Sequence, residues 1–236
     1  MWWIILVIVL IILLAFSAFY ALHLYVPQPP RIKKNKKYIA CIGDSITYGA
    51  GVILTKDFHS YPALLQKLVG KDYQVINYGY SGRTLLSSGD HPYVKEKQYQ
   101  ASINLNGDVY LIMLGTNDSK PHNWNKGKYE SELKNLIKSY KNLPNKPNVI
   151  VMIPPKAFPV KGMIKFDIND EIIKNEMIPT IRKVANELDI KTVDLYSLTE
   201  NRPELFIDGV HPNKKGNILI SNYIYEEIKK ICSELH

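Results

Sequence analysis

The chain has 236 residues, and beyond an uncharged apolar N-terminal stretch about 200 remain, enough for one domain with a sizeable core. Its 30 lysines and arginines outnumber its 22 aspartates and glutamates, which gives a net charge of +8. The lysines are scattered and form no basic stripe, so the composition gives no support for nucleic-acid binding.

The N-terminal stretch MWWIILVIVLIILLAFSAFYAL contains no charged residue. About 20 apolar residues cross a bilayer as a helix, and Trp2, Trp3 and Tyr25 fall near the ends of such a span, where aromatic rings favour the membrane interfaces. A cleaved signal peptide would have a cationic start and a shorter apolar core. We therefore expect residues 1–25 to form a retained transmembrane anchor.

A linker is predicted over residues 26–37. It begins with VPQPP, a stiff non-helical spacer, because proline fixes its own φ and restricts the residue before it. The run RIKKNKK follows, which suits either a solvated tether or contact with anionic lipid headgroups. The remaining residues, 38–236, are predicted to form the single folded domain.

Short apolar stretches alternate with helical patterns along this domain. Buried strands are predicted at 37–43, 73–79, 108–114, 148–154 and 191–196. Helices are predicted at 61–70, 128–143 and 169–188 and after HPNKKGN, the third of them kinked or broken near Pro179. This alternation predicts an α/β fold with a parallel sheet and helices on both faces.

Four polar clusters lie where predicted strands end or where the final helix begins. They are GDSITYG (43–49), GYSGR (79–83), GTND (115–118) and DGVHP (208–212). Ligands of such sheets bind at the carboxyl ends of the strands, so we expect the clusters to meet at one edge.

The clusters contain the groups that acyl transfer requires. A serine hydroxyl such as that of Ser45 is a poor nucleophile unless a base takes its proton, and Asp208 and His211 supply an imidazole with its orienting carboxylate. The backbone amides of Ser45 and Gly82 and the side chain of Asn117 are candidate donors to the negative charge that develops on the substrate.

In order and approximate spacing, the four clusters resemble the motif blocks of the SGNH or GDSL hydrolases. The resemblance extends from about Tyr38 to the last helix and implies a flavodoxin-like three-layer α/β/α sandwich. The α/β-hydrolase fold is disfavoured, because Thr47 stands where its G-x-S-x-G motif needs the second glycine.

The resemblance also implies residue roles. Ser45 matches the nucleophile, Gly82 and Asn117 match the oxyanion-hole residues, and His211 with Asp208 matches the base and its orienter. It implies no cofactor.

Three looser matches, LGTNDSKPHNW, INDEIIKNEMIP and PELFIDGVHPN, are similar to the family's carbohydrate acetylesterase branch. Trp124 could then stack on a sugar ring and Arg83 could bind a polar or anionic group. The alternative is that Trp124 packs a loop and Arg83 pairs with a local carboxylate.

The expected function is hydrolysis of small acyl esters, acetyl above all, on an acetylated glycan. The alternatives are an O-acyltransferase acting on cell-envelope glycans and a lysophospholipase or thioesterase acting on lipid esters. A non-catalytic binding domain is disfavoured by the complete set of five site residues.

Other polar residues are predicted to have structural roles. Cys41 and Cys232 lack a CxxC partner and are expected to be free thiols, Cys41 in a strand. The histidines show no metal-ligand spacing, so no metal site is expected. Asp44 and Asp118 are expected to hydrogen-bond within their own turns.

The orientation of the predicted span has two opposing indications. The cations of RIKKNKK follow the span, which by the positive-inside rule alone keeps the domain in the cytoplasm. Long domains translocate largely regardless of charge, and a tethered enzyme acting on sugar esters suits the cell envelope. We expect a single-pass anchor with the domain on the extracytoplasmic face.

Overall fold

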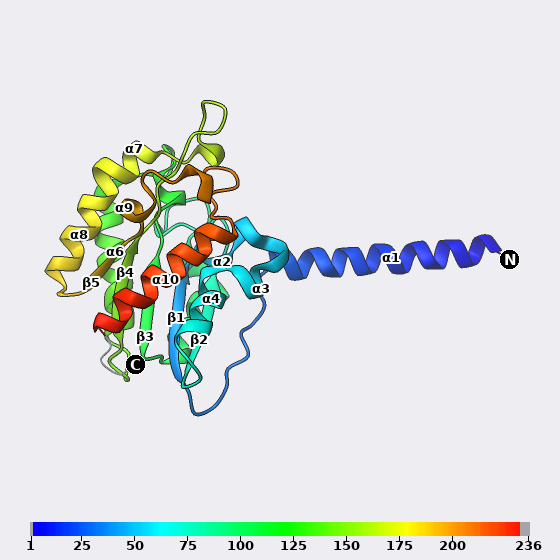
Figure 1. Ribbon diagram of the computed structural model, residues 1–236, viewed down its shortest axis with the longest axis horizontal. Coiled ribbons are helices and arrows are strands. Elements are labelled where there is room, and N and C mark those ends of the chain that lie inside the picture. The colour runs from blue at the N-terminus through cyan, green and yellow to red at the C-terminus, as the bar shows by residue number, and fades with distance from the viewer. Residues whose placement is uncertain (1, 232–236) are drawn as a thin grey trace.

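The computed structural model describes residues 2–231, which form an α/β domain and one long helix that projects from it (Figure 1). This helix, α1 (Trp2–Tyr25), has 24 residues, and none of those in its most apolar stretch, Trp2–Phe19, is buried. By length and composition α1 can cross a membrane, although a signal sequence has the same properties.

Five parallel strands form one sheet in the order β2-β1-β3-β4-β5. The strands are β1 (Lys37–Gly43), β2 (Tyr73–Gly79), β3 (Val109–Met113), β4 (Asn148–Ile153) and β5 (Lys191–Asp194). The first two have the predicted bounds, and the others lie within one or two residues of them. This strand order is that of flavodoxin-like folds, so the predicted fold class is confirmed.

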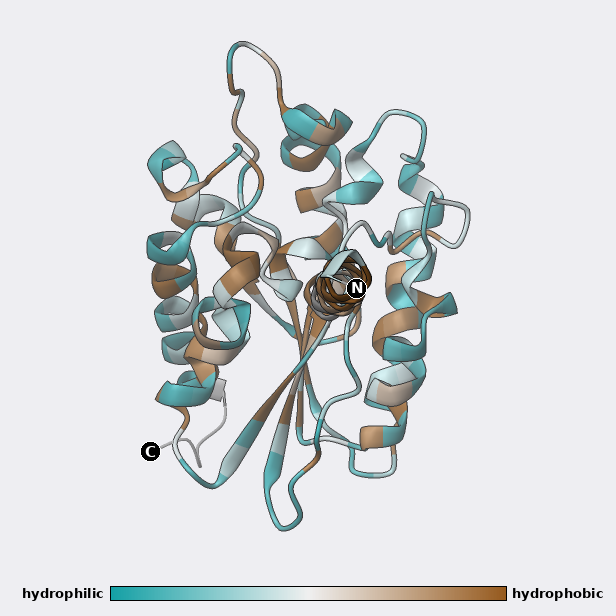
Figure 2. Cartoon of the chain, turned by 90° about the vertical axis from the view of Figure 1, so that its right-hand side faces the viewer, coloured by the Kyte–Doolittle hydropathy of each residue, from teal (hydrophilic) through white to brown (hydrophobic). Residues whose placement is uncertain are grey.

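Helices cover both faces of the sheet and complete three layers, with the hydrophobic strands in the middle (Figure 2). Successive strand residues point to opposite faces. Ile39 and Cys41 accordingly pack in one cluster and Ala40 and Ile42 in another. Helices α4 (Tyr61–Leu68) and α10 (Lys214–Ile231) cover the first cluster, and α5 (Lys97–Leu105), α6 (Lys126–Lys141) and α8 (Ile178–Glu187) cover the second.

The helix predicted over 169–188 is interrupted directly before Pro179. It consists of α7 (Asp170–Ile172), a π-helical turn η5 (Ile173–Met177) and α8, in whose first turn Pro179 lies. Because proline has no N–H, it is tolerated in a first turn but would leave a hydrogen bond unmade in a helix interior. Helix α5 was not predicted, because its sequence KQYQASINL has only a weak apolar face.

Two glycines at strand ends let the chain after β1 return close to the sheet. A Cβ atom at Gly43 would collide with the side chain of Thr47, and one at Gly79 would collide with the backbone at Thr47 and Tyr48. Both contacts involve the short helix α2 (Ser45–Tyr48). The glycines thus allow this helix to begin immediately beyond the end of β1.

The linker is held against the domain along part of its length. The backbone amide of Lys33 donates to the side chain of Gln74 at 2.8 Å, and the Gln74 amide group donates to the Arg31 carbonyl at 2.7 Å. The linker descends along the domain from the end of α1 to the start of β1 (Figure 1).

Of the two cysteines, only Cys41 lies within the described residues. It is a free thiol buried in β1, and burial raises its pKa well above the usual thiol value. Cys232 lies outside the described residues.

Candidate active site

The four predicted clusters meet at the carboxyl edge of the sheet. Ser45 is the first residue of α2, directly after β1, and Gly82 lies in the loop after β2. Asn117 begins the 3₁₀ helix η3 (Asn117–Ser119) after β3, and His211 lies in the loop before α10. All four residues line one pocket of about 400 Å³.

Helix α2 fixes the position of Ser45. The carboxylate of Asp44 accepts a hydrogen bond from the Ile46 amide at 2.9 Å and so caps the helix. Gly49 ends it in the left-handed conformation that glycine adopts without strain. Ser45 itself is only 8% exposed, and it lines the pocket from a largely buried helical turn.

A chain of hydrogen bonds joins the serine, the histidine and the aspartate. His211 Nε2 lies 2.9 Å from Ser45 Oγ, and His211 Nδ1 lies 2.8 Å from Asp208 Oδ2. The other carboxylate oxygen of Asp208 accepts from the backbone amides of Val210 and His211 at 3.0 and 2.8 Å. The carboxylate is therefore held from two sides, and it orients the imidazole towards Ser45.

The environment of Asp208 favours its charged form. Burial alone would raise the pKa of this carboxyl, but the His211 ring and the His211 and Val210 amides lower it to about 2. A lowered pKa adds stability that is present above the unfolded pKa near 4 and is lost as the pH falls towards 2. Asp208 is consequently an anion throughout the neutral range, which is the state that stabilises an imidazolium.

Three candidate donors to a substrate oxyanion belong to residues that line this pocket: the backbone amides of Ser45 and Gly82 and the side chain of Asn117. Gly82 has φ +81°, in the left-handed region, so a side chain here would strain the backbone although space is available for it. The Asn117 side-chain amide donates to the Arg83 carbonyl at 3.1 Å and lies 3.4 Å from Asp44 Oδ2. These contacts hold the Asn117 amide group in the pocket wall beside Ser45.

Two buried aspartates support the loops around the site. Burial raises the pKa of Asp44 to about 6, against the opposing effect of the Ile46 amide. Burial likewise raises the pKa of Asp118 to about 7. The prediction that Asp118 holds its own loop is wrong in its main part, because its carboxylate accepts from the Leu85 and Leu86 amides, in the loop after β2.

Much of the pocket wall is apolar. The residues that form this part of the wall are Tyr25, Ala50, Ile53, Phe166, Ile168 and Val210. The Phe166 ring approaches the His211 ring edge-on, with 5.3 Å between their centroids, and Phe166 has φ +64°. None of these wall residues was predicted to line the site. All but Val210, which lies within DGVHP, come from outside the four polar clusters.

Arg83 and Trp124, the predicted substrate contacts, are not among the residues that line this pocket. Arg83 donates through Nε and Nη2 to Glu96 at 2.9 and 2.7 Å and stacks on the Tyr80 ring. Trp124 donates to Glu176 at 3.0 Å and packs against Tyr129. Arg83 therefore pairs with a carboxylate, as the alternative interpretation required. Trp124 contacts helix α6 and the π-helical turn η5 rather than a loop.

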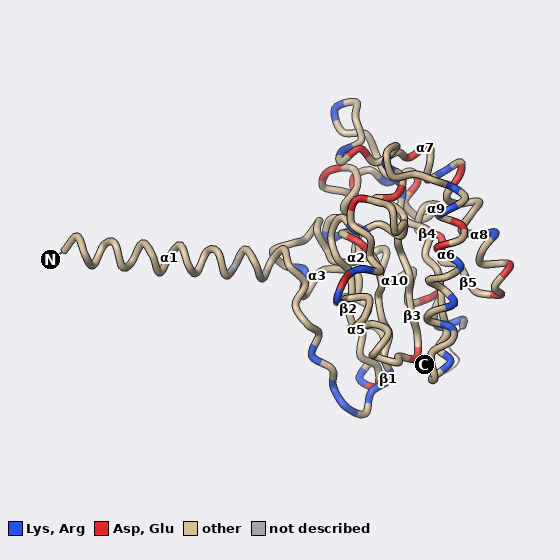
Figure 3. Tube along the Cα trace, turned by 180° about the vertical axis from the view of Figure 1, so that it is seen from behind, with Lys and Arg blue, Asp and Glu red and all other residues tan. Residues whose placement is uncertain are grey.

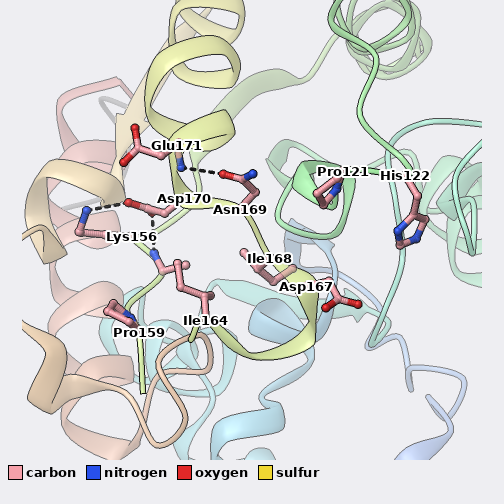
Figure 4. A pocket seen from close by; sticks show the side chains of 11 residues that line it. Pro121, His122, Lys156, Pro159, Ile164, Asp167, Ile168, Asn169, Asp170 and Glu171 are labelled. Atoms are coloured by element: carbon pink, nitrogen blue, oxygen red, sulfur yellow. Dashed lines mark hydrogen bonds and ion pairs between the residues drawn. The ribbon is translucent and has the colours of Figure 1, made fainter. Parts of the chain in front are cut away.

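A second cavity of about 680 Å³ lies beside the first, and Ile168 lines both (Figure 4). Two of its polar side chains are paired with each other: Asp170 accepts from Lys156 Nζ at 2.7 Å, and it also accepts from the Ala157 backbone amide at 3.0 Å. Nowhere in residues 2–231 do three or more histidine, cysteine or acidic side chains gather in a way that could hold a metal ion.

The three-layer fold, with serine, histidine and aspartate joined at the carboxyl edge of its sheet, defines the class of protein as an acyl-ester hydrolase of the SGNH type. The chain belongs to the GDSL-like lipase/acylhydrolase family, whose sequence pattern matches residues 41–218. The predicted family and the predicted enzyme class, an esterase, are thus confirmed.

Individual relatives agree with this assignment. In an alignment of length 219 that covers 85% of this chain, the chain is 34% identical to an acetylxylan esterase from Xylanibacter ruminicola. The match covers only 45% of that esterase, so the chain spans less than half of the curated relative's length.

Solved structures match the fold. A carbohydrate acetylesterase from Sinorhizobium meliloti superposes with a TM-score of 0.65 at 20% identity and covers 83% of this chain and 100% of its own. A lipase/acylhydrolase from Enterococcus faecalis does so with a TM-score of 0.66 at 24% identity and covers 83% and 96%, respectively. At these identities the likeness establishes the fold alone.

Proposed function

We propose that the protein is a membrane-anchored serine esterase that removes small acyl groups, acetyl above all, from a carbohydrate. The observation that carries the proposal is the continuous chain of hydrogen bonds from Asp208 through His211 to Ser45, with 2.8 and 2.9 Å between the nitrogen and oxygen atoms. The acetyl and carbohydrate parts are supported by the identity to an acetylxylan esterase.

In the proposed mechanism, His211 Nε2 takes the proton of Ser45 Oγ while that oxygen attacks the ester carbonyl. Asp208 stabilises the imidazolium that forms. The amides of Ser45 and Gly82 and the side chain of Asn117 donate hydrogen bonds to the tetrahedral oxyanion.

His211 then gives its proton to the leaving alcohol, and an acyl group remains on Ser45. The neutral His211 next takes a proton from water, which attacks the acyl-enzyme through a second tetrahedral intermediate. Collapse of that intermediate returns the proton to Ser45 and releases the carboxylic acid, so the site ends in its starting state.

The acyl preference can be measured directly. Hydrolysis of p-nitrophenyl acetate should proceed with a higher kcat/KM than hydrolysis of p-nitrophenyl octanoate, because a small acyl group leaves the pocket free for the alcohol part of the ester. The same measurement on Ser45→Ala provides the background rate for each ester. A strong preference for the octanoate would contradict the acetyl assignment and favour a lipid-ester substrate.

We further propose that residues 1–25 are a retained anchor, that 26–37 are its linker and that 38–236 are the hydrolase domain, held on the extracytoplasmic face. The anchor is supported by the 24-residue apolar helix α1. Its orientation is supported by the envelope location expected for a sugar-ester substrate.

Protease added to intact spheroplasts should therefore degrade the domain without permeabilisation. A cytoplasmic protein of the same cells serves as the control for membrane integrity. Protection of the domain until detergent is added would show that it is cytoplasmic and that the proposed orientation is wrong.

A further inference from the structure

The end of the apolar helix is attached directly to the element that carries the proposed nucleophile. The hydroxyl of Tyr48 donates to the Leu24 carbonyl, in the last turn of α1, at 2.7 Å. Tyr48 is the last residue of the four-residue helix α2, and Ser45 is the first. Tyr25, the final residue of α1, lines the same pocket as Ser45.

The length of α1 places this contact at the membrane surface. Its 24 residues extend about 36 Å as an α-helix, and the hydrocarbon core of a bilayer is about 30 Å thick. If the helix spans the bilayer, Tyr25 therefore lies at the level of the lipid headgroups, which is where tyrosine is enriched. The pocket that Tyr25 lines then begins at that level as well.

Apolar side chains are exposed beside the end of α1. The 3₁₀ helix η1 (Ala50–Thr55) contacts α1, and the short helix α3 (Lys56–His59) follows it directly. Leu54 on η1 is 71% exposed, and Phe58 on α3 is 64% exposed. Exposing apolar side chains of this size to water is unfavourable, and their transfer into the headgroup region of a bilayer lowers the free energy.

Cationic residues lie on the same side of the domain. Arg31, Lys33 and Lys34 of the linker are exposed, and Figure 3 shows the basic linker on the side from which α1 leaves. Basic residues are attracted electrostatically to a bilayer surface that contains anionic lipid. We call Leu54, Phe58 and these three linker cations the membrane face.

We propose that the membrane face rests on the bilayer, and that the Ser45 pocket takes its ester from the membrane surface, as an acylated sugar carried by an amphiphile whose hydrocarbon chain remains in the bilayer. This inference rests on the proposed esterase function and names its substrate class.

The position of the pocket next to the end of α1 favours a substrate at the membrane surface over a polymer distant from the membrane. The Tyr48–Leu24 hydrogen bond joins the helix that carries Ser45 to the end of the span, which holds the pocket near the membrane surface. Next to Tyr25 the wall contains Ile53 from η1, an apolar surface suited to the part of an amphiphile that leaves the bilayer.

The test uses the full chain in vesicles of phosphatidylcholine with a minority of phosphatidylglycerol. Two acetyl esters with identical heads are compared, an O-acetylated dodecyl glucoside in the vesicle membrane and the matched methyl glucoside in solution. We expect at least about tenfold faster turnover of the dodecyl ester at equal total concentration, because its tail holds the ester at headgroup level.

A surface variant separates the membrane face from simple co-localisation. Leu54→Ser together with Phe58→Ser keeps α1 and the pocket, so hydrolysis of soluble p-nitrophenyl acetate should be unchanged. The advantage of the dodecyl ester should fall severalfold. Met163→Ser is the matched control and should change neither activity. Met163 is 74% exposed and lies on the loop between β4 and α7, which contributes no residue to the membrane face.

Three results would each have a definite meaning. Equal turnover of the dodecyl and methyl esters, or a dodecyl advantage that the double variant retains in full, would overturn the inference. If either of these results occurred together with Ser45-dependent hydrolysis of p-nitrophenyl acetate, the esterase function would stand without the membrane inference. Failure to hydrolyse any acetyl ester would instead remove the proposed function.

The position of the membrane face can also be measured without catalysis. A nitroxide attached to Leu54→Cys in a Cys232→Ser background should be protected from a water-soluble nickel chelate and accessible to oxygen; Cys41 is buried. The same label at Met163→Cys should show the reverse. Equal exposure of both labels to the chelate would contradict a domain that rests on the bilayer.

Discussion

Ser45→Ala should lower the hydrolysis of p-nitrophenyl acetate by about three orders of magnitude or more. The alanine leaves the pocket and the His211–Asp208 pair in place but removes the oxygen that attacks the ester. The measurement is kcat/KM, together with labelling by a fluorophosphonate probe, which should modify the wild-type protein and not the variant. The midpoint of thermal unfolding should change little.

Ser81→Ala is the matched control for this variant. Ser81 lines the same pocket. Among the described contacts, its backbone carbonyl accepts a hydrogen bond from Arg83, whereas its hydroxyl makes none. Removing the Ser81 hydroxyl should lower kcat/KM by less than about tenfold, because the proposed mechanism gives this hydroxyl no part in attacking or binding the ester carbonyl. Wild-type turnover by a folded Ser45→Ala protein would rule out Ser45 as the nucleophile.

The second large effect concerns the histidine and its carboxylate. His211→Ala should reduce kcat about as much as loss of Ser45, because the serine hydroxyl then has no base. Asp208→Asn should reduce kcat at least about a hundredfold and yet leave measurable activity, because the histidine remains but its imidazolium is less stabilised. The comparison requires kcat values for both variants at neutral pH.

Asp167→Asn controls for the loss of a negative charge near the site. Asp167 is exposed and lines the neighbouring cavity, not the Ser45 pocket, so its replacement should leave kcat nearly unchanged. If Asp208→Asn were as active as the wild type, the carboxylate 2.8 Å from His211 Nδ1 would not orient the imidazole in catalysis.

The sheet was predictable because buried parallel strands are short, apolar and β-branched along their whole length. Strands β1 and β2 begin and end at the predicted residues, where Gly43 and Gly79 stop the apolar run. Helix α5 was not predictable in the same way, because it is partly buried and its apolar positions are few. Its place against the sheet depends on the strands that it covers.

The proposed catalytic residues were predictable from local sequence alone. Asp208 and His211 are three residues apart, so one turn suffices to pair them. Ser45 closely follows a predicted strand. In a parallel sheet the carboxyl ends of all strands lie at the same edge, so the position of Ser45 follows from the topology alone. Ser45 and His211 could therefore be predicted to meet although they are separated by 166 positions in the sequence.

The surroundings of the site were decided by tertiary structure. Arg83 follows Gly82 and was a reasonable candidate for substrate contact. In the structure its guanidinium instead donates to the carboxylate of Glu96, 13 residues further along the chain. Phe166 carries no motif, and only the fold of the loop after β4 brings its ring to His211. Such contacts join segments whose separation in sequence does not restrict their distance in space.

The sequence by itself determined the fold class, the strand edge at which the site lies and the residues that meet there, because these depend on local periodicity and on short motifs. It also determined that the first 25 residues are apolar enough to span a bilayer. Only the tertiary structure decided that Tyr25 lines the pocket beside Ser45, since this requires the helix end to dock on Tyr48. That docking depends on the packing of η1 and α2, which no pattern within either segment reveals.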